Sequence, residues 1–161
     1  MTADKITHRL EAVGIEADVG GYWLWKYATD FLAAAKSFEN LSHRFSPVPY
    51  YLVCRSIELS LKAYLYSRGV ARKGLKSLSH DLEEALSEAE AKSLSSHIQI
   101  SPDERNALIC ANQLYRGKEF EYFESLRAVY DPHEFSLETL AAFAERLLFS
   151  VESPVRQAII K

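Results

Sequence analysis

Basic residues gather in one connection of the chain, where they could bind an anion. Four of them fall within nine residues shortly before His80: Arg68, Arg72, Lys73 and Lys76. Phosphate groups need such charges and N–H donors, and a nearby helix start adds backbone N–H groups that favour an anion. The sequence therefore predicts a modest phosphate or nucleotide site at Arg72, Lys73 and His80. The alternative is a solvated loop in which His80 only fixes the start of a helix.

A second group of basic residues occurs together with aromatic residues farther along the chain. Arg116 and Lys118 are followed by Tyr122, and cations beside aromatic rings suit phosphate contact and stacking on bases. We expect Arg116 and Lys118 to be further ligand-binding candidates. Aromatic residues that belong to the core are the alternative interpretation of this stretch.

The sequence offers no pattern for a metal site or a cofactor. The five histidines show no metal-ligand spacing, and neither Cys54 nor Cys110 has a histidine close by. There is also no glycine-rich phosphate loop and no signature of a serine or cysteine triad. We therefore expect no metal and no cofactor.

The elements that must position these residues are helices, and the central one is predicted over residues 49–69. Pro47 and Pro49 suit a first turn, and Gly69 suits a helix end. Its main apolar stripe has helical spacing: Tyr50, Val53, Cys54, Ile57, Leu61, Tyr64 and Leu65. A second row consists of Leu52, Leu59 and Tyr66. A helix that is apolar on two sides is either central in a bundle or carries a partner interface. Glu58 and Lys62 have the spacing of a simple helical ion pair.

Other helices flank this one. A short helix is predicted over 6–13, and a long one over 22–45. One face of the long helix is apolar: Trp23, Tyr27, Phe31, Ala34 and Phe38. A basic connection follows Gly69, and Ser79 is the predicted N-cap of the next helix. Ser101, Pro102 and Glu104 form a capping-box pattern that predicts the start of a further helix.

A final helix begins at Asp131 or Ser136 and is stopped or kinked by Pro154. Strand patterns of period two are nearly absent. The prediction is an all-α chain forming a single domain over residues 1–161. It is an antiparallel up-and-down four-helix bundle with a short extra N-terminal helix in an extension over residues 1–20.

Composition excludes several classes of protein. The chain has 161 residues, 48% hydrophobic residues and a net charge of −3, which argues against disorder and against a general DNA-coating protein. No apolar run of about eighteen residues is present, so we expect no membrane span. The N-terminus lacks the apolar region of a secretion signal. Two cysteines far apart in sequence indicate buried thiols and a cytoplasmic location.

Three segments in order resemble the prokaryotic branch of the HEPN superfamily of helical bundles: IELSLKAYLYSRG (57–69), LSHDLEEAL (78–86) and ANQLYRGKEFEY (111–122). The resemblance spans roughly residues 49–148. It implies an up-and-down bundle that forms a homodimer and binds RNA, a nucleotide or a protein partner. It also implies a toxin–antitoxin or defence system, with a nucleotidyltransferase or antitoxin as partner. A purely structural dimerisation module is a further alternative.

The resemblance also implies a catalytic alternative, because many family members are metal-independent ribonucleases with an Arg and, four to six residues on, a His. Arg127 and His133 match this spacing. A neutral His can take the proton of a ribose 2′-hydroxyl while an Arg holds the phosphate, which would leave a 2′,3′-cyclic phosphate. Ala128 at the usually polar position and Pro132 depart from the pattern, and a surface ion pair or helix cap is the other interpretation.

Arg105 begins a second, incomplete copy of the family motif. Arg105 and Asn106 match its first half, but Cys110 stands where a His would be needed. Such a site has no base, so Arg105 is a ligand-binding candidate rather than a catalytic one.

Overall fold

The computed structural model describes residues 20–38, 46–120 and 136–159, and the regular structure within these ranges is entirely helical. The helices are α1 (Gly21–Ser37), α2 (Pro47–Ser67), α3 (Arg72–Ser77), α4 (Leu82–Ala91), the short 3₁₀ helix η1 (Leu94–Ser96), α5 (Pro102–Arg116) and α6 (Leu137–Ile159). The all-α prediction is therefore confirmed for the described residues. The helix predicted over 6–13 lies outside them, as do residues 39–45 of the long predicted helix.

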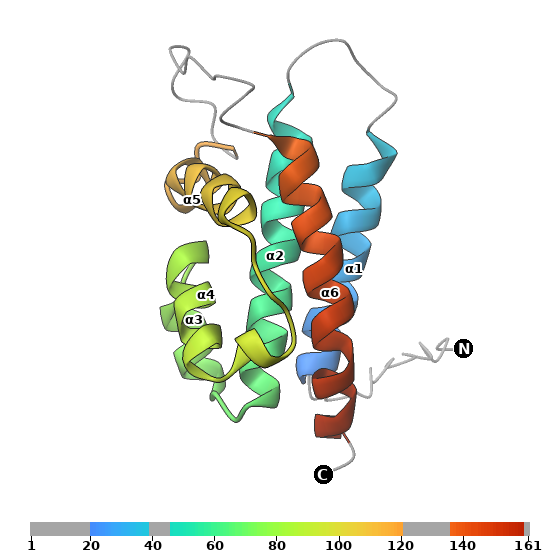
Figure 1. Cartoon of the computed structure of the whole chain (residues 1–161), viewed down its shortest axis with the longest axis vertical. Helices are drawn as coiled ribbons and strands as arrows, with labels where there is room; N and C mark the ends of the chain where they lie inside the picture. Colours follow the sequence, from blue (N-terminus) through green and yellow to red (C-terminus); the bar gives the residue numbers. More distant parts are fainter. Residues whose placement is uncertain (1–19, 39–45, 121–135, 160–161) are drawn as a thin grey trace, which may run out of the picture.

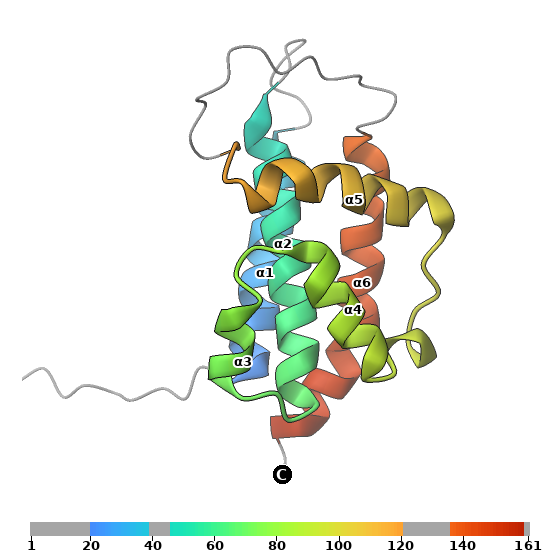
Figure 2. The ribbon, with the colours of Figure 1, turned by 90° about the vertical axis from the view of Figure 1, so that its left-hand side faces the viewer.

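Three long helices, α1, α2 and α6, lie side by side, and α3, α4 and α5 lie on the other side of α2 (Figures 1 and 2). The helix α1 runs antiparallel to α2, whereas α6 runs in the same direction as α2, and α5 lies across them. The strictly alternating order of an up-and-down four-helix bundle is thus not confirmed. Since α2 packs against each of the other five α-helices, its predicted central place is confirmed.

The ends of α2 follow from local sequence. The Ser46 side chain accepts a hydrogen bond from the backbone N–H of Val48, and Pro47 and Pro49 occupy the first turn. At the other end Gly69 has a φ of +86°, which a residue without Cβ adopts at little cost. The helix begins two residues before the predicted start, at Pro47.

Small residues let α1 approach α2 closely. A Cβ atom on Gly21 would lie 2.9 Å from the carbonyl oxygen of Ala63, so no larger residue fits there. Ser56 on α2 and Ala28 on α1 are both buried, and the hydroxyl of Ser56 donates to the carbonyl of Ala28 at 2.8 Å. The indole N–H of Trp25 donates to the carbonyl of Leu148 at 3.0 Å and so joins α1 to α6.

This close approach decides which face of α1 enters the core. The buried side chains of α1 are small or aliphatic: Ala28, Leu32 and Ala35. Most of the predicted apolar face points outward instead: Trp23, Tyr27 and Phe38 are 44%, 51% and 37% exposed, whereas Phe31 packs partly against the core. The bulky aromatic side chains of that face could not fit where the two helix backbones nearly touch.

Three local predictions are wrong. The connection after Gly69 contains the short helix α3. The N-cap of α4 is Asp81, whose carboxylate accepts from the backbone N–H of Glu84 at 3.1 Å, and not Ser79. Of the two effects predicted for Pro154, a stop or a kink, the stop is wrong, because α6 continues to Ile159. Pro154 itself is buried there, and burial of apolar side chains can offset one lost backbone hydrogen bond.

Candidate functional site

A pocket of about 500 Å³ opens between α2 and α3 and also borders α1 and the connection before α4. Its size is within the range usual for small-molecule sites. Its lining residues are Leu24, Arg55, Glu58, Leu59, Lys62, Tyr66, Arg72, Leu75, Lys76, Ser79 and His80. We call it the α2–α3 pocket. Four of these side chains are Lys or Arg and one is a carboxylate, so the lining carries a formal excess of three positive charges.

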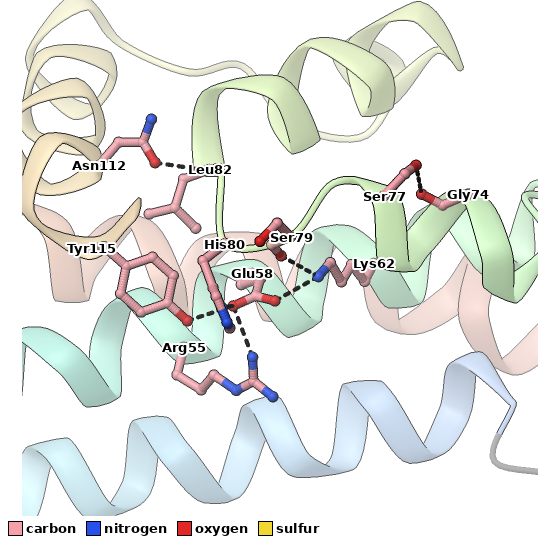
Figure 3. A network of polar contacts seen from close by, with 10 residues as sticks. All are labelled: Arg55, Glu58, Lys62, Gly74, Ser77, Ser79, His80, Leu82, Asn112 and Tyr115. Atoms are coloured by element: carbon pink, nitrogen blue, oxygen red, sulfur yellow. Dashed lines mark hydrogen bonds and ion pairs between the residues drawn. The ribbon is translucent and has the colours of Figure 1, made fainter. Parts of the chain in front are cut away.

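The carboxylate of Glu58 is the centre of a polar network at this pocket (Figure 3). Only 1% of Glu58 is exposed, yet four side chains reach it. Arg55 donates at 2.9 Å, Lys62 at 2.6 Å, and Nδ1 of His80 lies 3.1 Å away. The hydroxyl of Tyr115 also donates to it. A buried charge is costly unless it is paired and hydrogen-bonded, and here both conditions are met.

The network fixes the protonation of its members. Burial alone would raise the pKa of Glu58, but the charge of Arg55 and the hydrogen bonds from Lys62 and Tyr115 outweigh it and hold the pKa below its usual 4.5. Burial, together with the charge of Glu58, raises the pKa of Tyr115 far above its usual range. Tyr115 therefore remains a donor, and Glu58 remains charged.

Lys62 ties the network to the connection before α4. Besides Glu58, its ammonium group donates to the carbonyl of Ser79 at 2.6 Å. Ser79 has a φ of +47°, in the left-handed region that non-glycine residues rarely adopt. The contact with Lys62 helps to hold this turn, which in turn places His80 against Glu58.

Asn112 holds α5 against the start of α4. Its side-chain oxygen accepts from the backbone N–H of Leu82 at 2.8 Å, and its amide donates to Asp81 at 3.0 Å and to Glu83 at 2.9 Å. Burial opposes ionisation of Asp81. Nevertheless, the backbone N–H of Glu84 and the side chains of Arg116 and Asn112 hold the pKa of Asp81 below its usual value. The two helices and the turn between Ser79 and Asp81 thus form one hydrogen-bonded unit.

The structure brings some of the predicted site residues together and separates others. Arg72 and His80 line the α2–α3 pocket. Lys73 is exposed on α3 but is not part of the lining. Lys76, which belongs to the same predicted cluster, lines the pocket as well. Arg68, by contrast, contacts His97 at 2.6 Å.

The remaining candidates lie elsewhere. Arg105 pairs with Glu90 on α4, and Arg116 pairs with Asp81 at 3.1 Å. Lys118 is exposed beyond the end of α5. None of these three residues lines the pocket. Arg127 and His133 lie outside the described residues, so no geometry bears on the predicted catalytic pair.

The most connected residues of the network are not among the predicted site residues: Arg55, Glu58, Lys62 and Tyr115. The helical spacing predicts Glu58 and Lys62 only as a simple ion pair. Arg55 was not singled out. One signal was available, since Arg55, Glu58 and Lys62 follow each other at helical spacing on an apolar helix. The contact between Glu58 and Tyr115 joins residues 57 positions apart, so no local sequence pattern predicts it.

Among the described residues, no group of His, Cys, Asp and Glu side chains could hold a metal ion. None of the helices in the described ranges has the length and apolarity needed to cross a membrane. Comparisons with protein-family models, with curated proteins and with solved structures found no match for this chain. No relative of known function therefore narrows what the α2–α3 pocket binds.

Proposed function

We propose that this chain is a HEPN-like helical module that binds a phosphate-bearing ligand, RNA or a nucleotide, in the α2–α3 pocket. The observation that carries the proposal is the excess of cations in the pocket lining. Arg72 and Lys76 border it on α3, and Arg55 and Lys62 border it on α2. Arg and Lys side chains that converge on one hollow are the usual partners of phosphate oxygens.

The single carboxylate of the lining, Glu58, offsets one of the four positive charges and leaves an excess of three. Glu58 is buried beneath the pocket, and its oxygens are already used by Arg55, Lys62, His80 and Tyr115. The side chain of Lys76 makes no hydrogen bond or ion pair within the described part of the chain. Its ammonium group is therefore available to a ligand.

The histidine and the apolar side of the pocket add to the proposal. Because Nδ1 of His80 faces Glu58, Nε2 is the ring nitrogen left for a ligand. Leu24, Leu59, Tyr66 and Leu75 supply the apolar lining. A ligand with an anionic group and a flat apolar ring, such as a nucleotide, would match both sides.

Charge reversal on α3 tests the proposal with a matched control. Lys76→Glu places a carboxylate in the lining, whereas Lys73→Glu makes the same change on the same helix outside it. Binding of ATP and of a short single-stranded RNA is measured by calorimetry. We expect Lys76→Glu to weaken binding about tenfold or more, and Lys73→Glu to change it by less than about threefold.

Salt dependence gives a second measure, since phosphate contacts weaken as salt rises. Equal effects of the two reversals, or binding that does not respond to salt, would contradict phosphate contact in this pocket. A comparison of the affinities for ATP and for the RNA shows whether the pocket prefers a mononucleotide or a polymer. With EDTA present, the recovered RNA also reveals any cleavage, which His133→Ala would abolish if the endoribonuclease alternative held.

The partners implied by the HEPN resemblance belong to the same proposal. They are a second copy of the chain and a nucleotidyltransferase or antitoxin protein, in a toxin–antitoxin or defence setting. The side-by-side packing of α1, α2 and α6 is compatible with a bundle of this kind. In such a bundle α4 and α5, which both pack against α2, would occupy the position of the fourth helix.

A further inference from the structure

The imidazole ring of His80 lines the α2–α3 pocket with one nitrogen engaged and the other open (Figure 3). Nδ1 lies 3.1 Å from the carboxylate of Glu58, and the ring makes a T-shaped contact with Tyr115, with 5.6 Å between the ring centroids. Nε2 makes no hydrogen bond within the described part of the chain. It is open to solvent, since no buried side-chain nitrogen or oxygen there lacks a partner. Nε2 is therefore accessible to a ligand in the pocket.

The carboxylate of Glu58 decides which nitrogen of His80 carries the hydrogen. Glu58 is ionised, so its oxygens only accept hydrogen bonds. Nδ1 must then be the donor in this contact, and in a neutral ring the other nitrogen has no hydrogen. Nε2 is thus an acceptor. It pairs with a donor group on a ligand and not with a phosphate oxygen, which also accepts.

This property separates Nε2 from the other polar groups of the pocket lining. The Arg and Lys side chains only donate: Arg55, Lys62, Arg72 and Lys76. The hydroxyls of Tyr66 and Ser79 can donate or accept. The oxygens of Glu58 accept, but four side chains already use them. Nε2 of His80 therefore sets a requirement on the ligand that the cations do not set.

The surroundings of His80 indicate which donor of a nucleotide would reach Nε2. His80, Lys62 and Arg55 all contact the one carboxylate of Glu58, so the ring lies beside the cations. A donor that pairs with Nε2 must then be close to the phosphate. In a nucleotide the ribose hydroxyls meet this condition, whereas the amino group of a base lies farther away. The 2′-hydroxyl is the ribose hydroxyl that a free ribonucleotide shares with every position of an RNA strand.

We infer that His80 makes the α2–α3 pocket selective for ribonucleotides over deoxyribonucleotides, because Nε2 accepts a hydrogen bond from the ribose 2′-hydroxyl. The inference rests on the proposed function, since it needs a phosphate-bearing ligand in this pocket. Glu58 is a positioning residue that holds the ring and its hydrogen. A deoxyribonucleotide leaves Nε2 unpaired in the complex, and an acceptor that loses its partner weakens binding.

Pairs of ligands that differ in one hydroxyl test this selectivity. Calorimetry at pH 8 compares ATP with 2′-deoxy-ATP and with 3′-deoxy-ATP, and the short RNA with DNA of matching sequence. We expect loss of the 2′-hydroxyl to weaken binding about tenfold, and loss of the 3′-hydroxyl to change it by less than about threefold. Equal affinities within a 2′-pair that binds would overturn the inference and leave the proposed function standing. Failure of all these ligands to bind would overturn both.

His80→Asn separates the role of Nε2 from that of the whole side chain. The Asn amide can still donate to Glu58, but no atom takes the place of Nε2. We expect this variant to bind ATP and 2′-deoxy-ATP within about twofold of each other, and to bind inorganic triphosphate as the unmodified chain does. His97→Asn is the matched control, because His97 is exposed, contacts Arg68 and does not line the pocket.

The control variant should keep the preference for ATP, and circular dichroism checks the helix content of both variants. An equal loss of affinity for every ligand in His80→Asn, inorganic triphosphate included, would make His80 a phosphate contact and overturn the inference.

The position of the hydrogen on His80 has its own test, which needs no ligand. Nitrogen-15 NMR of labelled histidine rings distinguishes a hydrogen on Nδ1 from one on Nε2. At pH 8 we expect the hydrogen of His80 on Nδ1, facing Glu58. A hydrogen on Nε2 would overturn the inference, because Nε2 could then not accept from a hydroxyl.

Discussion

Nδ1 of His80 lies 3.1 Å from a carboxylate oxygen of Glu58, which joins the turn before α4 to the middle of α2. The same carboxylate accepts hydrogen bonds from Arg55, Lys62 and Tyr115. One buried charge therefore orders the polar side of the α2–α3 pocket. This arrangement makes the stability of the fold and the shape of the pocket depend on the same residues.

Removing the charge at Glu58 should destabilise the protein strongly. Glu58→Gln leaves Arg55, Lys62 and His80 facing an uncharged amide. Breaking a buried ion pair from one side typically costs about 3–5 kcal/mol, which urea unfolding can measure. Glu145→Gln is the control, because Glu145 belongs to an exposed pair with Lys36 and should cost less than about 1 kcal/mol. Similar losses for both variants would show that the Glu58 network adds little.

The pH dependence of stability follows from the same group. Since the pKa of Glu58 is lower in the folded chain than its usual 4.5, its contribution is complete above that pH. It is lost as the pH falls through the lowered folded pKa. Unfolding free energies measured across this acid range should therefore fall more steeply for the unmodified chain than for Glu58→Gln. Parallel curves would contradict the lowered pKa.

Tyr115 should contribute to stability mainly through its hydroxyl group. Tyr115→Phe keeps the buried ring but leaves the Glu58 carboxylate without one donor, which should cost about 1–3 kcal/mol in the free energy of unfolding. Tyr27→Phe makes the same change at an exposed ring and should cost almost nothing. If the two changes cost the same, the hydroxyl of Tyr115 has no special role.

Asn112 should be sensitive to changes that an adjacent residue tolerates. Asn112→Ala deprives the backbone N–H of Leu82 of its acceptor and frees α5 from the start of α4, at a cost of about 1–3 kcal/mol. Gln113→Ala alters the exposed neighbour on the same helix and should stay within about 0.5 kcal/mol. Thermal unfolding of both variants checks this difference. Equal melting temperatures would contradict the role given to Asn112.

Local rules predicted much of the fold. The prolines and Gly69 of α2 fix its ends through their own backbone preferences. The capping box at Ser101 forms as predicted, because Ser101 and Glu104 exchange hydrogen bonds three residues apart. The prediction of Ser79 as a cap failed for a nonlocal reason. The carbonyl of Ser79 accepts a hydrogen bond from Lys62 on α2, and Asp81 caps α4 instead.

Contacts between distant segments explain what sequence analysis could not predict. The rotation of α1 depends on the close approach of Gly21 to Ala63, so periodicity alone indicated the wrong face for the core. The burial of Glu58 depends on Tyr115 and His80, which arrive from two other parts of the chain. The predicted basic cluster contains Arg72 and Lys76, which both line the α2–α3 pocket, but local sequence did not separate them from Lys73, which lies on the same short helix outside the lining.

The most direct test of the proposed function is to locate the ligand on the chain. Amide and histidine-ring resonances are followed by NMR while ATP or the short RNA is added. We predict shifts confined to the α2–α3 pocket, at Lys62, Arg72, Lys76, Ser79 and His80, with little change at Lys73. Shifts that instead gather at Arg105, Arg116 and Lys118, or no shifts at saturating ligand, would contradict the proposed site.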